Sequence, residues 1–543
     1  MAVCRIMDEN ATAILGQGRS GVVLRCHDGQ GRDIARKIFR CTGVTKLVHY
    51  IVFGAPNPYL WCEHAVRAAA LRRQILSDLV DTWLTGKLRI AAAWEWHWNA
   101  QMGAYALDTE WIDGRHASLL QPFNEDRNDE AYDLYRNVMR PLQRHLVQAG
   151  FDGLLWQAGC GNPVALNNFL IDRKRPAGHW AWIDLESGVP ALFPANPLQL
   201  LQFYLPKSWR HGGPLFDDVD IAKLRCYVET HKESLESHLG QDRVRTMVQR
   251  IEELAGCQNR WRMPRRVDRS IQFASRQGRL TPAEAKWYAR HPTVWYRREL
   301  TRALRNALRK GITRAGKIVQ WFIRLDYSRV SRNLRDFLVS QQFRAALARG
   351  YVTRRIDHWE QRGQLNQGEA ALLRDHLDHE ESGSYLTDFG VHITTKPLVK
   401  VTTYVFVPFL VGAGVLAVGW IPFAIVFCGA TARTLYTGGR LIQSLLLGQE
   451  RPWIAFVAGL LPMIGNLAYP LQLAYASTSQ DHQLAQFILY DSFSQTGQQL
   501  PIWGGCDTLT EHHMNRLPKV LMRLRRNPVN IEAEPSCTDG DRP

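Results

Sequence analysis

The stretch AILGQGRSGVVL, residues 13–24, decides how the N-terminal part of this chain folds. It contains three glycines between two apolar runs, and the second run continues without the periodicity of a helix. Because glycine has no Cβ, backbone N–H groups in such a turn approach a phosphate closely. The sequence therefore predicts a turn that joins two strands and folds over phosphate groups. The glycines are Gly16, Gly18 and Gly21.

A second strand follows the glycine-rich segment and carries a lysine. A turn at residues 28–31 leads into DIARKIF at 33–39, where Lys37 stands 14 residues after Val23. Taken alone, Lys37 would be a surface lysine. With the glycine-rich segment at this spacing, the sequence resembles the N-lobe of the protein kinase superfamily. The resemblance implies that Lys37 binds the α- and β-phosphates of ATP and that the three glycines and Val23 cover the nucleotide.

The resemblance implies two glutamates in the same site. In the family, a glutamate on the following helix pairs with the strand lysine. Glu63, which begins a helical run to Leu76, is the candidate, with an insertion around residues 50–60. The segment LDTEWIDG at 107–114, which includes Glu110, resembles the hinge that meets adenine.

The segment GNPVALNNFLID, residues 161–172, resembles the kinase catalytic loop. In that loop a base aspartate is followed by a metal-binding asparagine and an apolar strand. Asn168 fits the metal position, but no aspartate stands at the base position, where the nearest polar residue is Asn162. Asp152 lies 16 residues before Asn168, so that only a rearranged loop would bring it in. Catalysis without this base and loss of catalysis are both open.

The segment WAWIDLESG, residues 180–188, resembles the metal-binding segment after the catalytic loop. The form Ile-Asp-x-Glu is closer to small-molecule and lipopolysaccharide kinases than to Asp-Phe-Gly. Asp184 alone would be a turn residue, but together with Asn168 it is a candidate Mg²⁺ ligand. No Ala-Pro-Glu segment follows, so we expect no activation loop for a protein substrate. The resemblance covers residues 10–255.

The positive charge of the chain is concentrated in one section. The 543 residues carry a net charge of +16, and residues 259–355 contain 25 Lys or Arg against five acids. The section also holds a weak repeat with a period of 85 residues, VxRxI at 267–271 and again at 352–356. Each copy predicts a helix that stops at Gly278 or Gly363, and a new helix capped by Thr281 or Asn366. A duplicated helical hairpin and chance similarity both explain the repeat.

Two partners, anionic lipid and nucleic acid, and a solvated bundle without a partner are the alternatives for the basic section. Trp295, Leu300, Leu304 and Leu308 recur among Arg and Lys, which is typical of a basic helix on a membrane. Anionic lipid is favoured over nucleic acid, because long apolar segments follow. A solvated helical bundle would carry the same charge. The ten cysteines have no zinc-site spacing, so we expect no structural metal.

Two uncharged segments predict a membrane region. Residues 401–432 and 452–480 contain no charged residue, and about 20 residues cross a bilayer as a helix. A hairpin of two spans places both termini on one side, and the flanking Arg and Lys indicate the cytoplasm. We therefore expect a multi-pass membrane protein with cytoplasmic termini. The alternatives are a re-entrant first segment and buried core helices.

Together these observations predict an α+β two-lobed protein-kinase-like domain, an α-helical basic region and a transmembrane helical hairpin. The expected divisions are an N-lobe at 1–113, a C-lobe at 114–255, the basic region at 256–395, the hairpin at 396–480 and a partly disordered tail at 481–543. The expected function is that of a membrane-anchored, ATP- and Mg²⁺-binding phosphotransferase. A catalytically inactive pseudokinase scaffold and a basic membrane-interaction protein without nucleotide are the alternatives.

Overall fold

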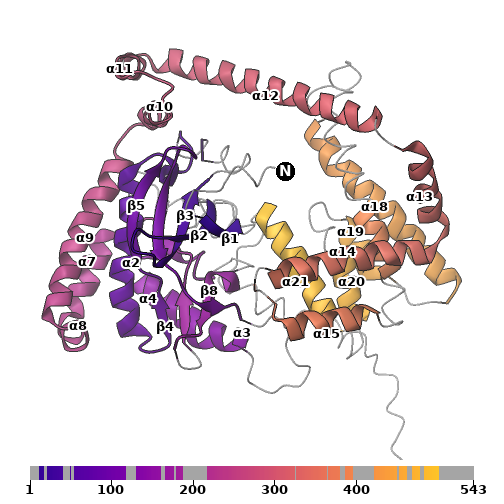
Figure 1. Cartoon of the computed structure of the whole chain (residues 1–543), viewed down its shortest axis with the longest axis horizontal. Helices are drawn as coiled ribbons and strands as arrows, with labels where there is room; N and C mark the ends of the chain where they lie inside the picture. The colour runs from indigo at the N-terminus through magenta and orange to yellow at the C-terminus, as the bar shows by residue number, and fades with distance from the viewer. Residues whose placement is uncertain are drawn as a thin grey trace, which may run out of the picture.

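The structure is a computed structural model of the whole chain. It describes residues 11–17, 21–40, 49–50, 54–117, 130–159, 165–175, 179–186, 217–323, 326–361, 363, 365–378, 386–394, 421–448, 452–460, 468–476 and 482–499. Two sheets and many helices make the chain an α+β protein (Figure 1).

The first sheet is antiparallel and has five strands in the order β1-β2-β3-β6-β5. The strands on either side of the glycine-rich segment pair with each other, which confirms that part of the prediction. Between β2 and β3 the Asp28 carboxylate accepts hydrogen bonds from the backbone N–H groups of Gln30 and Arg32, which fixes the turn. The strands are β1 (Ala11–Gln17), β2 (Gly21–His27), β3 (Asp33–Phe39), β5 (Ala93–Asn99) and β6 (Ala104–Glu110).

A long helix, α2 (Glu63–Trp83), packs against the face of this sheet that carries Phe39 and Leu107. On its other side, α2 is joined to α9 (Gln241–Arg262) by ion pairs between Arg67 and Glu253 and between Asp78 and Arg243. The short helices α7 (Ile221–Thr230) and α8 (Lys232–Leu239) precede α9. Residues 221–262, assigned above largely to the second lobe, thus pack along the helix of the first (Figure 1).

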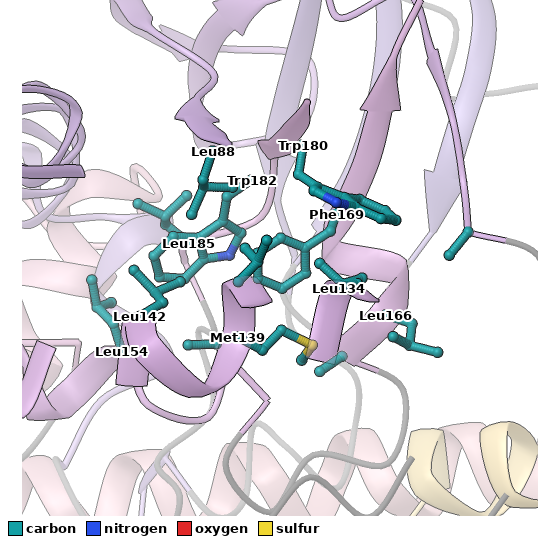
Figure 2. Close-up of a cluster of buried hydrophobic side chains, with 14 of the residues drawn as sticks. Leu88, Leu134, Met139, Leu142, Leu154, Leu166, Phe169, Trp180, Trp182 and Leu185 are labelled. Carbon is teal, nitrogen blue, oxygen red and sulfur yellow. The ribbon is translucent and has the colours of Figure 1, made fainter. Parts of the chain in front are cut away.

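The second sheet is smaller, with the order β4-β9-β8-β7, and only its β4–β9 pair is parallel. Its apolar face covers a helical segment formed by α3 (Glu130–Asp133), η3 (Leu134–Met139) and α4 (Arg140–Gln148). The rings of Phe169 and Trp182 stack in this core, beside Met139 and Leu142 (Figure 2). The strands are β4 (Leu88–Ile90), β7 (Gly114–Arg115), β8 (Phe169–Asp172) and β9 (Trp180–Trp182).

The basic section is helical, as predicted, and both expected helix stops are present. Gly278 and Gly363 have φ of 65° and 66°, a conformation that favours glycine. After each glycine, a capping box begins the next helix, formed by Thr281 with Glu284 and by Asn366 with Glu369. The helices are α10 (Arg266–Arg276), α11 (Pro282–Arg290), α12 (Pro292–Ile323), α13 (Tyr327–Val339), α14 (Gln341–Gln361) and α15 (Gln367–Asp378).

One expectation for the basic section is wrong. Trp295 does not belong to an exposed apolar stripe, because its side chain is 1% exposed and its indole N–H donates to Ser270 at 3.0 Å. It closes the small core of the α10–α11 hairpin with Val267 and Ile271. Leu300 is exposed, so these two residues are divided between a core and the surface, and the side chains of Leu304 and Leu308 lie outside the described part.

The C-terminal helices pack with α14 and α15 into a bundle (Figure 1). These helices are α18 (Ile421–Leu446), α19 (Trp453–Leu460), α20 (Ala468–Ala476) and α21 (His482–Gln499). Asp491 on α21 binds the guanidinium of Arg355 and the indole N–H of Trp359, which ties α21 to α14. Phe487 and Tyr490 pack against Trp359 in the same core.

The expected transmembrane hairpin is absent from the described residues, where no helix is long and apolar enough to cross a membrane. The uncharged run 452–480 contains two short helices, α19 and α20, of eight and nine residues. Most of the first uncharged run, residues 401–420, lies outside the described residues. Its last residues belong to α18, which continues through Arg433 and Arg440. Arg440 forms an ion pair with Asp388 at 2.9 Å.

Candidate functional site

Lys37 is the centre of the candidate site. It lies on β3 directly opposite Val23 of β2, and its side chain is buried on the sheet face that also carries Leu107. Its ammonium donates to the Asp184 carboxylate at 2.5 Å and to the backbone carbonyl of Glu186 at 2.9 Å. The lysine of the first sheet thus binds the segment that leaves the second sheet.

The β8–β9 hairpin brings Asn168 and Asp184 to one end of the second sheet. Asn168 comes directly before β8, and Asp184 comes two residues after β9. Phe169 pairs with Trp182 in the ladder. Beyond this pair Asn168 faces Ile183, whose N–H donates to the Asn168 carbonyl at 2.9 Å. The sequence indicated both Asn168 and Asp184 as metal ligands, and the structure places both at this end of the hairpin. The Asp184 side chain is 37% exposed and therefore accessible.

The amide of Asn168 is held by a residue that the sequence analysis missed. Its Nδ2 donates to the backbone carbonyl of Gln157 at 2.9 Å and lies 3.5 Å from the Gln157 Oε1. Because these contacts use the nitrogen, the amide oxygen is the atom left for a metal. Gln157 is buried, and its amide does not act as a proton acceptor as a carboxylate would.

A buried ion pair supports the lysine. Glu186 and Arg73 are each 1% exposed, and the guanidinium donates to both carboxylate oxygens at 2.7 and 2.9 Å. Arg73 also donates to the carbonyls of Ala91 and Ile183, which follow β4 and β9, so it joins α2 to the second sheet. Burial alone would raise the pKa of Glu186, but the charges of Arg73 and Lys37 outweigh it and lower the pKa to about 2. Glu186 is therefore ionised at neutral pH.

A second buried group lies beside this pair. Arg72, the neighbour of Arg73 on α2, donates to the Tyr59 hydroxyl, which donates to Asp217 at 2.9 Å. Burial lowers the pKa of Arg72, but nearby Tyr59 and Asp217 outweigh it, so the net shift is upward. Burial also raises the pKa of Tyr59 well above its ordinary value. Two adjacent arginines on α2 thus face buried acids from two other segments.

The structure separates the other predicted residues into three groups. Gly16 and Gly21 lie at the facing ends of β1 and β2, and Val23 lies beside Lys37. Gly18 and Asn162 lie outside the described residues. Glu63 and Glu110 are described but lie apart from the lysine, and both differ from what the sequence suggested.

Glu63 is not the partner of Lys37. It is the exposed first residue of α2, whereas the carboxylates that contact the lysine belong to Asp184 and Glu186. The pairing expected from the resemblance is therefore wrong, since α2 contributes Arg73 to this network instead. Glu110 ends β6, and its carboxylate accepts from Arg89 at 2.8 Å. Its side chain is thus engaged in an ion pair, and its backbone N–H donates to the Ala92 carbonyl at 2.8 Å, so neither is left for adenine at the expected hinge.

One cue in the sequence could have identified the missed arginines. Arg72 and Arg73 stand as a pair inside the apolar run AAALRRQIL, residues 68–76. Charged side chains in such a run are buried only when they are paired, so the run predicts buried acidic partners. Nothing in the spacing identifies those partners, which lie more than 100 residues away.

Comparison with known protein families, curated proteins and solved structures found no match to this chain. Among the described residues, no group of three or more His, Cys, Asp or Glu side chains could hold a metal ion. A Mg²⁺ site needs fewer protein ligands, because this ion keeps several waters and is bound through one or two carboxylates and the phosphates of a substrate. The pair Asn168 and Asp184 fits that pattern.

Proposed function

We propose that the N-terminal part of the chain binds ATP with Mg²⁺ and transfers phosphate from it, as an atypical protein-kinase-like phosphotransferase beside an anionic lipid surface. The observation that carries the proposal is the contact between Lys37 and Asp184, with Asn168 at the same strand end. In protein kinases the lysine on the third strand binds phosphates, and an asparagine and an aspartate hold the metal ions. Lys37 lies on the third strand here as well.

Different residues would bind the phosphates, the metal ion and the nucleotide. Lys37 would bind phosphate oxygens, and the oxygens of Asn168 and Asp184 would hold Mg²⁺. Val23, opposite Lys37 on the same sheet face, would pack against the nucleotide. ATP supplies the phosphoryl group, and positioned charges provide most of the catalysis in this chemistry. The buried pair of Arg73 and Glu186 would keep the lysine and the Asp184 segment in position.

A second candidate function is nucleotide binding without transfer. The observation that favours it is Gln157, whose side chain lies beside Asn168 and offers no carboxylate as a base. We expect a Gln157→Asp variant to separate the two candidates through the rate of ATP-dependent phosphate release. If the natural chain releases no detectable phosphate and the variant does, the natural domain binds nucleotide without transferring phosphate. A measurable rate in the natural chain that the variant leaves unchanged would support transfer without this base.

The experiment that tests nucleotide binding is thermal unfolding of the full chain with and without Mg-ATP. A ligand that binds only the folded state stabilises it by about 3 kcal/mol at 100 times its Kd. We expect the melting temperature of the N-terminal part to rise, and Lys37→Ala and Asp184→Ala each to abolish the rise. Asp81→Ala, which removes a half-exposed carboxylate near the end of α2 that faces Arg243 of α9, is the matched control. No rise in the natural chain, or a rise that both site variants keep, would contradict the proposal.

A further inference from the structure

Helix α13 has two opposite faces of different chemistry. Leu334, Phe337 and Leu338 follow the spacing of one helix face, i, i+3 and i+4. The arginines at 329, 332 and 335 lie about 100° to 220° around the helix from Leu334, on the other side. Helices with an apolar face and a basic face are typical of segments that lie in a membrane interface.

The apolar face of α13 is exposed in this structure. The side chain of Leu334 is 56% exposed and that of Leu338 is 68% exposed, whereas a helix of a globular protein usually buries such a stripe. Adjacent exposed leucines on a regular helix indicate a surface that binds something apolar.

The charges of α13 are equally accessible. Arg329, Arg332 and Arg335 are exposed, and no ion pair joins them to a carboxylate within the described part of the chain. Helix α13 carries these three arginines and one acid, Asp336, which gives a net charge of +2. The helix that carries the exposed leucines is therefore cationic, and its partner is expected to be anionic.

A second exposed apolar stripe lies on α18. Leu435, Ile442 and Leu446 follow the spacing i, i+7 and i+11 and are all exposed. Figure 1 shows α13 and α18 on the side of the molecule away from the first sheet. A planar partner that contacts α13 would leave the candidate nucleotide site of the first sheet uncovered.

We propose that α13 docks the chain onto an anionic lipid bilayer and lies in the plane of its interface, with its leucines among the acyl chains and its arginines at the headgroups. Nucleic acid would satisfy the arginines but not the leucines, and an apolar protein groove would satisfy only the leucines. This inference specifies the lipid part of the proposed function and is independent of nucleotide binding. It is an attachment along the surface, distinct from the spanning attachment expected from the sequence.

The test is sedimentation of the full chain with lipid vesicles, either phosphatidylcholine alone or phosphatidylcholine mixed with phosphatidylglycerol, at low salt. We expect binding to the mixed vesicles only. A basic side chain near an anionic surface contributes about a fivefold factor in affinity, so Arg329→Gln with Arg332→Gln and Arg335→Gln should weaken binding about 100-fold. Leu334→Ser with Leu338→Ser should weaken it at least about tenfold, since two exposed leucines lose their contact with lipid.

Controls make the result specific to α13. Val248→Ser with Leu372→Ser, which changes two exposed apolar residues on α9 and α15, should bind the mixed vesicles like the natural chain. The melting temperature and its response to Mg-ATP should be the same in all variants, because the substituted side chains are exposed. Failure of lipid binding is thereby distinguished from failure of the nucleotide site.

Each other outcome would overturn the inference. Unchanged binding by the leucine variant, with loss in the arginine variant, would indicate a purely electrostatic contact with the headgroups, in which the leucines do not enter the acyl chains. Equal losses in the leucine variant and the control would show that α13 has no special part. Equal binding to both kinds of vesicle would remove the role of the arginines.

Discussion

The pair of Arg73 and Glu186 allows a quantitative prediction about the candidate site. Arg73→Met keeps a long side chain but removes four hydrogen bonds, two to Glu186 and one each to the carbonyls of Ala91 and Ile183. Removing one partner of a buried ion pair leaves an uncompensated charge and costs about 3–5 kcal/mol. We therefore expect the local stability of α2 and of the segment after β9 to fall by that amount.

The assay is hydrogen exchange by mass spectrometry on the full chain. It reports the free energy of opening for the peptides that cover α2 and β9. A double variant, Arg73→Met with Glu186→Met, should lose less than the sum of the single losses, because no buried charge of the pair remains. A difference of about 1–3 kcal/mol between the double loss and that sum is expected for groups in direct contact.

Arg225→Met is the matched control, since Arg225 forms an exposed ion pair with Glu252 on the neighbouring helices. Exposed pairs contribute about 1 kcal/mol or less, so its peptides should change little. The reasoning would be refuted if Arg73→Met cost no more than this control, or if the losses of the two single variants simply added in the double variant.

Three further predictions concern packing, pH and the C-terminal bundle. Gly21→Ala should cost about 1–3 kcal/mol in thermal unfolding without nucleotide, because a Cβ there would lie 2.3 Å from the Ile38 carbonyl oxygen, whereas Gly16→Ala meets nothing within 4 Å and should be tolerated. Since the pKa of Glu186 falls from 4.5 to about 2 on folding, its ionised form contributes about 3 kcal/mol of stability that is present above pH 4.5 and lost as the pH falls to 2. Calorimetry over this range should show a flatter dependence for Glu186→Gln. Asp491→Asn should cost about 3 kcal/mol and speed hydrogen exchange in α14 and α21, because it leaves the guanidinium of Arg355 without its carboxylate.

Local features of the fold were predictable from the sequence. The strands around the glycine-rich segment follow from apolar runs separated by glycine, which is information held within a dozen residues. The same is true of the helix stops at Gly278 and Gly363 and the capping boxes that follow them, since each depends on residues within one turn. The joint position of Asn168 and Asp184 follows from two short strands that pair as a hairpin.

Features that depend on distant partners were not predictable in this way. The resemblance predicted that a glutamate on the following helix pairs with Lys37, and Glu63 was the candidate because it begins that helix. The acid that the helix actually binds is Glu186, and it becomes a partner only when the two sheets are assembled around α2. Gln157 was missed for the same reason, because its contact with Asn168 depends on the conformation of the loop between them.

The helical part shows a related limit. An apolar run without charge predicts burial, but burial against protein and burial in lipid leave the same pattern of residues. The burial of Ala455 and Tyr469 depends on packing within the bundle. Likewise, Trp295 satisfies the spacing of a lipid-facing stripe, yet its indole N–H finds Ser270 in a small protein core.

In the network around Lys37, helix α2 contributes a base, Arg73, and the acid, Glu186, comes from the segment after β9. In the family that the N-terminal sequence resembles, the helix brings a glutamate to the strand lysine. Here the helix brings Arg73 to Glu186, whose carbonyl in turn accepts from Lys37. Because Arg73 also binds the carbonyl of Ile183, α2 holds both sides of Asp184 in the chain. The contacts of Arg73 therefore fix the backbone on both sides of Asp184, while the hydrogen bond from Ile183 to the Asn168 carbonyl fixes that backbone to the start of β8.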